Sequence, residues 1–334
     1  MGPFTVVIAD PPAADHEVEA TALRASGLPL EVVWLDARDP ARLLEHAADA
    51  DAVVVSWLPM TRSVIDQLAR CRVIARFGIG VDMIDLEAAT ARGILVCNTA
   101  TYCLDEVSNH ALGLLLMLNR GLLADVEAVR DGGWFRAQAA PPRRLAGQRL
   151  GLVGLGNIGR LVARKARNFG LDIVAYDPYL QRSADAIEGT PLIGLDELLS
   201  SADVVSVHCP LNASTHHLLG ARELGLLKPT AYLINTARGA IVDQAALVSV
   251  LAGRRIAGAA LDVFETEPLP PDDPLRALDN VILTPHAASW SVESSLECRR
   301  VAVEHVATVL RGGVPADVVN RAVLDQPRVS VHAD

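Results

Sequence analysis

The stretch that decides the fold reads Leu150-Gly151-Leu152-Val153-Gly154-Leu155-Gly156-Asn157-Ile158-Gly159. An apolar strand comes first, and the segment that follows, 160–169, is expected to be a helix ending at Gly170. The glycines match G-x-G-x-x-G, a weak signal alone, since a chain with 24 glycines produces such spacings by accident. Between a strand and a helix, however, two glycines let the backbone approach a pyrophosphate, and the third lets helix and strand pack closely. Asn157 and Ile158 then stand at the helix N-terminus, whose N–H groups face the anion. The stretch predicts a dinucleotide-binding turn.

The residue after the next strand predicts which dinucleotide is bound. Asp177 follows the strand expected at 173–176 and stands 18 positions after Gly159. An acidic residue here accepts hydrogen bonds from the ribose hydroxyls of adenosine and repels a 2′-phosphate. Pro178 and Tyr179 supply no cation for such a phosphate, and Arg182 is the only nearby candidate. The sequence therefore predicts NAD rather than NADP.

Strands and helices alternate on both sides of this turn. In the first array, strands are expected at 5–9, 31–34, 52–55, 73–75 and 94–96, with helices at 18–25, 41–48 and 63–71. A long apolar helix at 106–119 and a polar stretch lead to a second array, with strands at 150–153, 173–176, 204–207, 231–234, 259–261 and 281–283. A helix at 292–310 and a weak strand at 318–319 complete the chain. Continuously apolar strands between helices are typical of parallel sheets covered on both faces, so we predict an α/β fold with two βα domains.

The amino-acid composition limits the classes of partner that the protein can bind. The 334 residues suit two domains of about 150 residues each, and 51% hydrophobic residues support packed cores. Because 40 acidic residues outnumber 30 basic ones, the formal charge of −10 argues against nucleic acid or an anionic membrane as a partner. No apolar run is long enough to cross a membrane, and the first ten residues are interpreted as a strand and not as a signal peptide. Five scattered cysteines predict reduced thiols in the cytoplasm, and no metal site is predicted.

Polar residues follow the strands of the second array where each apolar run stops. They are Asp177, then His208 and Pro210, then Thr236, Ala237 and Arg238, then Asp262, and finally His286. Ligands of open α/β sheets bind beyond the carboxyl ends of the strands. A lone histidine after a strand is more often capped or solvent-facing than catalytic. Several polar groups on one edge, beside a dinucleotide, nevertheless predict a functional site.

Three side chains form a set suited to hydride transfer. Such a site needs a cation that orients a substrate carboxylate and carbonyl, and the planar two-pronged guanidinium of Arg238 fits this role. His286 is the natural acid/base, because histidine titrates near neutral pH. Glu267 would stabilise the imidazolium if it contacts that ring, and sequence separation alone does not establish the contact.

Four ordered motifs, at 153–159, 235–239, 260–268 and 284–286, resemble the NAD-dependent D-isomer-specific 2-hydroxyacid dehydrogenase family over nearly the whole chain. The resemblance implies a flavodoxin-like substrate domain of residues 1–100 and 287–334, into which a Rossmann-type NAD domain of residues 101–286 is inserted. It also implies an active site in the cleft between the domains and a homodimer formed through the NAD domains. Arg238, Glu267 and His286 match the catalytic arginine, glutamate and histidine of the family.

The resemblance also implies which residues of the first array bind the substrate. The segment 76–82 is similar to the family loop whose backbone N–H groups hold the substrate carboxylate, and Thr215 is similar to a threonine beside the cofactor. The substrate-binding residues implied in this way are Arg76, Gly78, Ile79 and Gly80, with Trp57 and Trp290 as aromatic walls. The loop 56–60 carries no cation, so we expect a substrate side chain that is small or apolar and uncharged.

The favoured hypothesis is an enzyme that reduces a small 2-oxoacid with NADH or oxidises the matching D-2-hydroxyacid. An NAD(H)-sensing, corepressor-like dimeric binding protein is the alternative, because 176–180 and 285–288 resemble the branch containing the C-terminal-binding-protein corepressors, which retain the catalytic set. That branch has tryptophan where this chain has Ser289, and Trp290 comes one position later. A phosphite-type dehydrogenase on the same scaffold is a third hypothesis.

Overall fold

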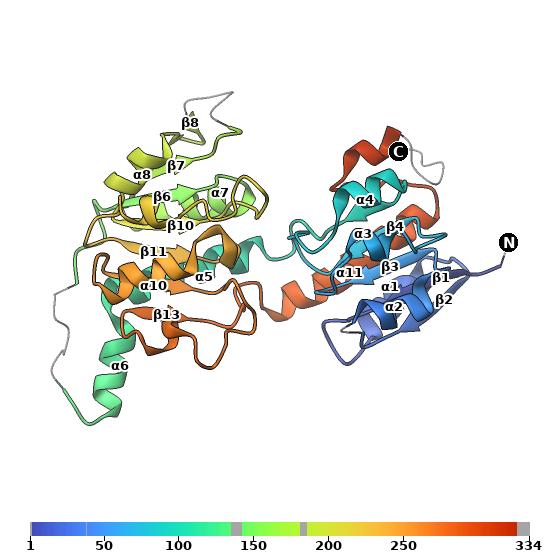
Figure 1. Cartoon of the computed structure of the whole chain (residues 1–334), viewed down its shortest axis with the longest axis horizontal. Coiled ribbons are helices and arrows are strands. Elements are labelled where there is room, and N and C mark those ends of the chain that lie inside the picture. The colour runs from blue at the N-terminus through green and yellow to red at the C-terminus, as the bar shows by residue number, and fades with distance from the viewer. Residues whose placement is uncertain (1, 38, 135–141, 181–185, 326–334) are drawn as a thin grey trace. The chain divides into compact units, whose positions relative to one another are not determined.

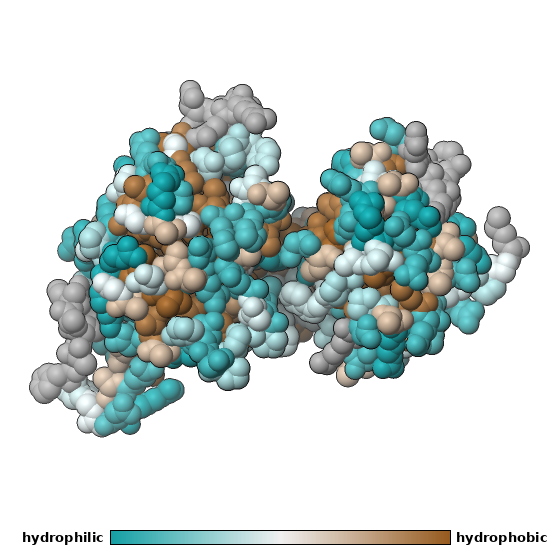
Figure 2. Space-filling view, viewed as in Figure 1, coloured by the Kyte–Doolittle hydropathy of each residue, from teal (hydrophilic) through white to brown (hydrophobic). Residues whose placement is uncertain are grey.

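The computed structural model describes residues 2–37, 39–134, 142–180 and 186–325. These residues form two compact units (Figure 1). The first unit contains the described parts of 1–102 and 291–334, and the second contains those of 103–290. The face of each unit seen in Figure 2 carries mainly hydrophilic residues, with apolar residues showing between them. None of the helices in the described ranges is both long and apolar enough to span a membrane.

The first unit is built on a five-stranded parallel sheet with the order β2-β1-β3-β4-β5. Its strands are β1 (Phe4–Ile8), β2 (Leu30–Trp34), β3 (Ala52–Val55), β4 (Val73–Arg76) and β5 (Leu95–Cys97). Its helices are α1 (Glu17–Ala25), α2 (Pro40–Ala47), α3 (Arg62–Ile65), α4 (Leu86–Ala91), α11 (Val292–Leu310) and the 3₁₀ turn η3 (Arg321–Asp325). Alternate residues of the strands enter two separate apolar cores, one of them shared with α11, so the sheet is covered on both faces.

The second unit is built on a six-stranded parallel sheet with the order β13-β12-β11-β10-β6-β7. Its strands are β6 (Arg149–Val153), β7 (Asp172–Tyr176), β10 (Val204–Val207), β11 (Tyr232–Asn235), β12 (Gly258–Leu261) and β13 (Val281–Leu283), with a small antiparallel pair, β8 (Ala186–Ile187) and β9 (Thr190–Pro191). Its helices are α5 (Leu104–Arg120), α6 (Leu122–Arg130), α7 (Asn157–Arg167), α8 (Leu195–Ser201), α9 (Ala221–Leu224), α10 (Gln244–Ala252) and the 3₁₀ turns η1 (Gly239–Ile241) and η2 (Pro274–Ala277). Helix α5 packs against α7 and against β11 and β12.

The predicted α/β class with parallel sheets is confirmed. The predicted bounds of several helices were wrong, and one helix was missed. The helix expected at 63–71 ends at Ile65, because Ala69 N–H turns away to donate to Ala48 O at 2.7 Å. The helix expected from Arg160 begins at Asn157, since Arg160 N–H already donates to Gly156 O. The weak strand at 318–319 is a single antiparallel bridge between Val318 and Cys97. Helix α6 lies in the stretch that was expected to be polar and irregular.

The chain passes from the first unit to the second after Tyr102 and returns to the first after Trp290. Both points come a few residues later than the expected boundaries, after residues 100 and 286. The second difference has a clear cause. Ala287 N–H and Ala288 N–H each donate to the carboxylate of Asp262 at 2.9 Å, and Asp262 follows β12. Residues 287–290, which were expected in the substrate domain, therefore belong to the second unit.

Candidate active site

The glycine-rich turn between β6 and α7 has the shape that a dinucleotide needs. Gly154 has φ +98, and a Cβ there would lie 2.6 Å from Cys209 N. A Cβ at Gly159 would lie 2.4 Å from Gly154 O, so these two glycines let the strand, the helix and the loop after β10 meet. At Gly156 a Cβ would meet nothing within 4 Å, and no side chain of the described residues caps the α7 N-terminus. The first N–H groups of the helix therefore face open space, which fits a pyrophosphate.

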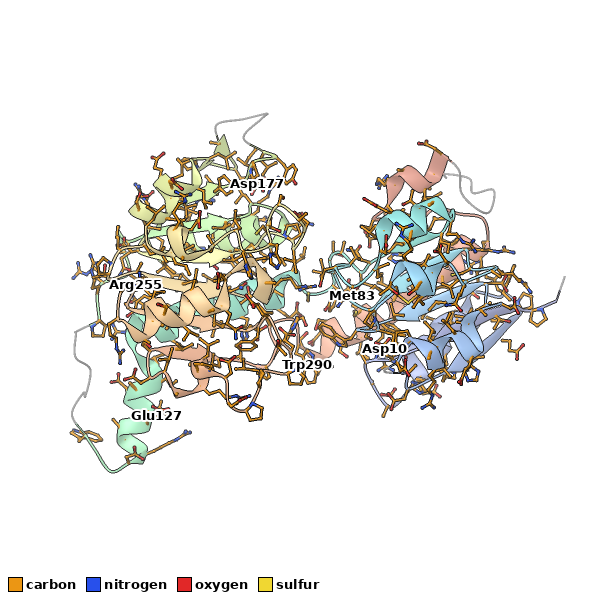
Figure 3. The ribbon with its side chains drawn as sticks, in the orientation of Figure 1. Asp10, Met83, Glu127, Asp177, Arg255 and Trp290 are labelled. Carbon is orange, nitrogen blue, oxygen red and sulfur yellow. The ribbon has the colours of Figure 1, made fainter. Side chains whose placement is uncertain are left out.

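Asp177 joins the end of β7 to this turn. Its Oδ2 accepts from Leu155 N–H at 3.0 Å, and its Oδ1 accepts from Tyr179 N–H at 3.1 Å and Leu180 N–H at 3.2 Å (Figure 3). A carboxylate has about four lone-pair sites, so it retains capacity to accept from a ribose hydroxyl. Arg182, the only cation considered for a 2′-phosphate, lies outside the described residues.

The loop after β10 carries three of the predicted cofactor residues, and it forms a wall of the turn. His208 Nε2 lies 2.9 Å from Ser206 Oγ, and burial lowers the pKa of His208 to about 4, so its ring is neutral at neutral pH. Thr215 Oγ1 donates to Pro210 O at 2.6 Å and accepts from Asn212 N–H at 2.8 Å. These contacts shape the loop, and they exclude His208 as an acid/base near neutral pH.

The turn after β11 places Arg238. Asn235 holds the turn from inside, because its Oδ1 accepts from Ala237 N–H at 3.0 Å and its Nδ2 donates to Arg238 O at 2.9 Å. The buried hydroxyl of Thr236 has no hydrogen-bond partner among the described residues. An unpaired buried hydroxyl on the carboxyl edge of the sheet fits a bound ligand that supplies the partner. The residues predicted on this edge thus accommodate a dinucleotide.

The loop after β12 brings Glu267 to His286. Glu267 Oε2 lies 2.7 Å from His286 Nδ1, and Glu267 Oε1 accepts from Phe264 N–H at 2.9 Å. Burial opposes ionisation of Glu267, but the hydrogen bond and charge of His286, the Phe264 N–H and the charge of Arg238 outweigh it and hold the pKa of Glu267 below its usual value. The structure therefore brings Glu267 into direct contact with His286, and the charge of Arg238 acts on the same carboxylate.

Asp262 anchors the segment that carries His286. This carboxylate is fully buried. Its Oδ1 accepts from Thr284 Oγ1 at 2.6 Å and from Ala287 N–H, and its Oδ2 accepts from Ala288 N–H. His286 itself has φ +51, a left-handed conformation that costs energy unless the surroundings impose it. The sequence predicted Asp262 as a cofactor contact, and the structure shows it holding the backbone on either side of His286.

Of the residues predicted for the substrate side, all but Trp290 follow or end strands of the first sheet, at its carboxyl edge. Arg76 is only 4% exposed, its Nε donates to Ser56 O at 3.2 Å, and its guanidinium lies 5.3 Å from the ring centre of Trp57. A Cβ at Gly78 (φ +138) would lie 2.0 Å from Arg76 Nη1, so only glycine fits beside this cation. Gly78 N–H donates to Thr99 Oγ1 at 2.8 Å and to Arg76 O at 3.0 Å. The N–H of Gly78 is thus engaged within the protein, and the predicted role of this loop in holding a substrate carboxylate stays a prediction.

Asp10, which the sequence did not single out, fixes the loop that carries Trp57. Its carboxylate accepts from Ser56 and Trp57 N–H, both at 2.6 Å, and from Leu58 N–H at 2.9 Å. Burial raises the pKa of Asp10 although these donors and Arg76 oppose the change. Trp290, the other predicted aromatic wall, is 83% exposed and ends the second unit. No group of three or more metal-ligating side chains occurs in the described part of the chain.

The fold and the site define a dinucleotide-dependent dehydrogenase of the α/β class. Residues 112–288, more than half of the chain, match the family described as "D-isomer specific 2-hydroxyacid dehydrogenase, NAD binding domain". The chain belongs to this family, which confirms the resemblance seen in the sequence. It is accordingly an NAD-dependent oxidoreductase that interconverts 2-oxoacids and D-2-hydroxyacids.

Individual relatives agree with this assignment. The chain is 38% identical over 299 residues to a glyoxylate reductase of Korarchaeum cryptofilum, covering 87% of this chain and 90% of that protein. It is 37% identical to a D-3-phosphoglycerate dehydrogenase of Mycobacterium tuberculosis, covering 94% of this chain but only 58% of that longer protein. A crystal structure of an NADPH-dependent glyoxylate/hydroxypyruvate reductase from Sinorhizobium meliloti, with NADP and malonate, superposes with a TM-score of 0.83 at 33% identity, covering 96% and 98% of the two chains.

Proposed function

We propose that Arg238, Glu267 and His286 are the catalytic residues and that the substrate is a small 2-oxoacid such as glyoxylate. The observation that carries the proposal is the 2.7 Å contact of Glu267 Oε2 with His286 Nδ1, beside the charge of Arg238. Relatives named as glyoxylate reductases support the substrate class.

Each side chain has a distinct chemical task. The guanidinium of Arg238 would pair with the substrate carboxylate and polarise the carbonyl oxygen. Because Nδ1 of His286 is engaged by Glu267, we assign proton exchange with the substrate oxygen to Nε2. Glu267 would orient the ring and stabilise the imidazolium that gives up this proton. NADH, when bound, supplies the hydride that the carbonyl carbon accepts.

The two units divide the remaining tasks. We propose the second unit as the NAD domain, with the turn 154–159, Asp177, Thr236 and Ala237 facing the cofactor. The first unit would hold the substrate carboxylate through the N–H groups of Ile79 and Gly80, since that of Gly78 is already used within the protein. The ring of Trp57 and the buried Arg76 would line the side chain of the substrate.

We also propose a homodimer formed through the second unit. Helix α6 buries none of its residues within the chain and leaves Leu122, Leu123, Val126 and Val129 between 38% and 55% exposed. Apolar residues that share one short helix in this way are typical of a contact surface. Size-exclusion chromatography with light scattering should give a molar mass of twice that of one chain. Val126→Asp should lower the measured mass to that of a single chain. A cytoplasmic location fits the five free thiols, of which four are buried.

The function is tested by assaying NADH oxidation with glyoxylate, pyruvate and longer 2-oxoacids and determining the chirality of the product. We expect turnover of at least one of them to a D-2-hydroxyacid, lost in His286→Ala. Wild-type activity too low to measure on every 2-oxoacid, together with tight NADH binding, would favour the sensing role instead.

A further inference from the structure

A histidine on the helix that opens the second unit reaches the segment that carries His286. His110 lies in α5, and its Nε2 is 3.2 Å from Thr284 Oγ1 and 3.6 Å from Asp262 Oδ1. We infer that His110 is a positioning residue, which sets the orientation of His286 through Thr284 and Asp262. The inference rests on the proposed catalytic role of His286, and it adds a residue that neither the motifs nor the family assignment singles out.

The direction of the hydrogen bonds follows from the number of protons available. The hydroxyl of Thr284 has a single proton, and it donates this proton to Asp262 Oδ1 at 2.6 Å. Thr284 Oγ1 must then accept from His110, so Nε2 of His110 carries a proton. The three side chains form a chain of donors that runs from α5 to the buried carboxylate.

This chain ends on the atoms that fix the backbone of His286. The Asp262 carboxylate accepts from Ala287 and Ala288 N–H, and its backbone oxygen accepts from His286 N–H at 2.8 Å. Of the described residues, His110 is the one basic side chain within 4.0 Å of this fully buried carboxylate. Because His286 has a left-handed φ, its ring points at Glu267 only while these contacts hold.

Helix α5, which carries His110, is itself held in place by contacts with its neighbours. On its first turns, Asp105, Ser108 and Asn109 all receive hydrogen bonds from Lys165 Nζ on α7, at distances from 2.5 to 2.8 Å. Helix α5 also packs against β11 and β12. His110 thus connects a helix fixed on the sheet to a loop that must hold its conformation during turnover.

The test compares two replacements of His110 with a neighbour as control. His110→Phe keeps a planar aromatic ring, slightly larger than imidazole, but removes the donor, and His110→Gln places an amide N–H near the position of Nε2. Asn109→Ala, the matched control on the same helix, loses contacts to Asp105 and Lys165 but none to Thr284. For each variant, kcat, KM for the 2-oxoacid, Kd for NADH and Tm are measured on the full chain.

We expect His110→Phe to lower kcat by about tenfold or more, on the scale of a small misplacement of a reacting group, while Kd for NADH stays within about twofold. His110→Gln should restore kcat to within about threefold of wild type, and Asn109→Ala should leave it unchanged. In a double-mutant cycle, His110→Phe and Thr284→Val should be non-additive, because both interrupt one chain of hydrogen bonds.

Three results would overturn the inference. The first is a wild-type kcat in His110→Phe, and the second is a failed rescue by His110→Gln at unchanged Tm. The third is additivity of the two substitutions in the cycle. A failure of the proposed function is recognised separately, because His286→Ala would then retain the kcat of the wild type.

Discussion

Gly239 lies so close to Phe264 that a Cβ on the glycine would stand 1.9 Å from the backbone carbonyl carbon of Phe264. The turn that carries Arg238 and the loop that carries Glu267 therefore meet backbone to backbone. Arg238 directly precedes Gly239, and Glu267 accepts from the N–H of Phe264, so this backbone contact joins the two turns that carry these side chains.

Gly239→Ala should accordingly separate the two loops. We expect a loss of stability of about 1–3 kcal/mol, the usual cost of overpacking, and a fall in kcat/KM of at least about tenfold. Gly194→Ala is the control, because a Cβ at that position meets nothing within 4 Å. Urea unfolding and steady-state kinetics measure the two effects, and wild-type values for Gly239→Ala would contradict the geometry.

His286→Ala removes the proposed acid/base. The value of kcat should fall by about 10²-fold or more, which is the usual contribution of a general acid/base, and NADH binding should stay near normal. Fluorescence titration with NADH and single-turnover kinetics separate binding from chemistry. His46→Ala, an exposed histidine of α2, serves as the control. A kcat within threefold of wild type in His286→Ala would assign the proton transfer elsewhere.

Glu267→Gln tests the carboxylate partner through the pH profile. Without the negative charge the protonated ring of His286 is less favoured, so the profile of 2-oxoacid reduction should move to lower pH. The pKa of Glu267 is held below its usual value of 4.5, so the charged contact with His286 is fully present above that pH and is lost as the pH falls through the lowered pKa. A profile identical to that of wild type would mean that the 2.7 Å contact does not operate in turnover.

Asp177→Ala tests the choice of cofactor. The wild type should prefer NADH to NADPH, because a carboxylate beside the adenosine ribose repels a 2′-phosphate. The substitution should reduce that preference, because it removes the hydrogen bonds that help to bind NADH and also removes the carboxylate that repels the 2′-phosphate of NADPH. The ratio of kcat/KM for the two cofactors is the measurement, and a wild-type ratio at or below one would refute the assignment.

The substrate side chain should be small or apolar rather than phosphorylated. A phosphate needs several cations, yet the loop 56–60 has none, and Arg62 already lies 3.6 Å from Asp85. The guanidinium of Arg76 is buried beneath the ring of Trp57. We expect a higher kcat/KM for glyoxylate than for 3-phosphohydroxypyruvate. A kcat/KM ten times higher for 3-phosphohydroxypyruvate than for glyoxylate would contradict this prediction.

The strands, and the polar residues that follow them, were predictable because their signals are local. Each apolar run had the length of a buried strand, and Arg238 and His286 stood where such a run stopped. The contacts that orient them were not predictable. Those of Asp262 with Ala287 and of His110 with Thr284 join residues 25 and 174 positions apart, and only the packing of the sheet and α5 creates them. Helix α6 was missed although Leu122, Val126 and Val129 recur at helical spacing, because the whole stretch between 119 and 149 was taken as polar.

The burial of His208 separates two kinds of pH response. His208 adjoins the glycine-rich turn, since a Cβ on Gly159 would stand 3.7 Å from its Cβ, yet with a pKa of about 4 its ring is neutral near neutral pH. The electrostatic environment that His208 offers to a pyrophosphate is thus constant across the range in which free histidine titrates. If His208 lies beside the bound coenzyme as proposed, its protonation adds nothing to the pH dependence of coenzyme binding near neutral pH. Any change in Kd for NADH with pH in that range must then come from other groups.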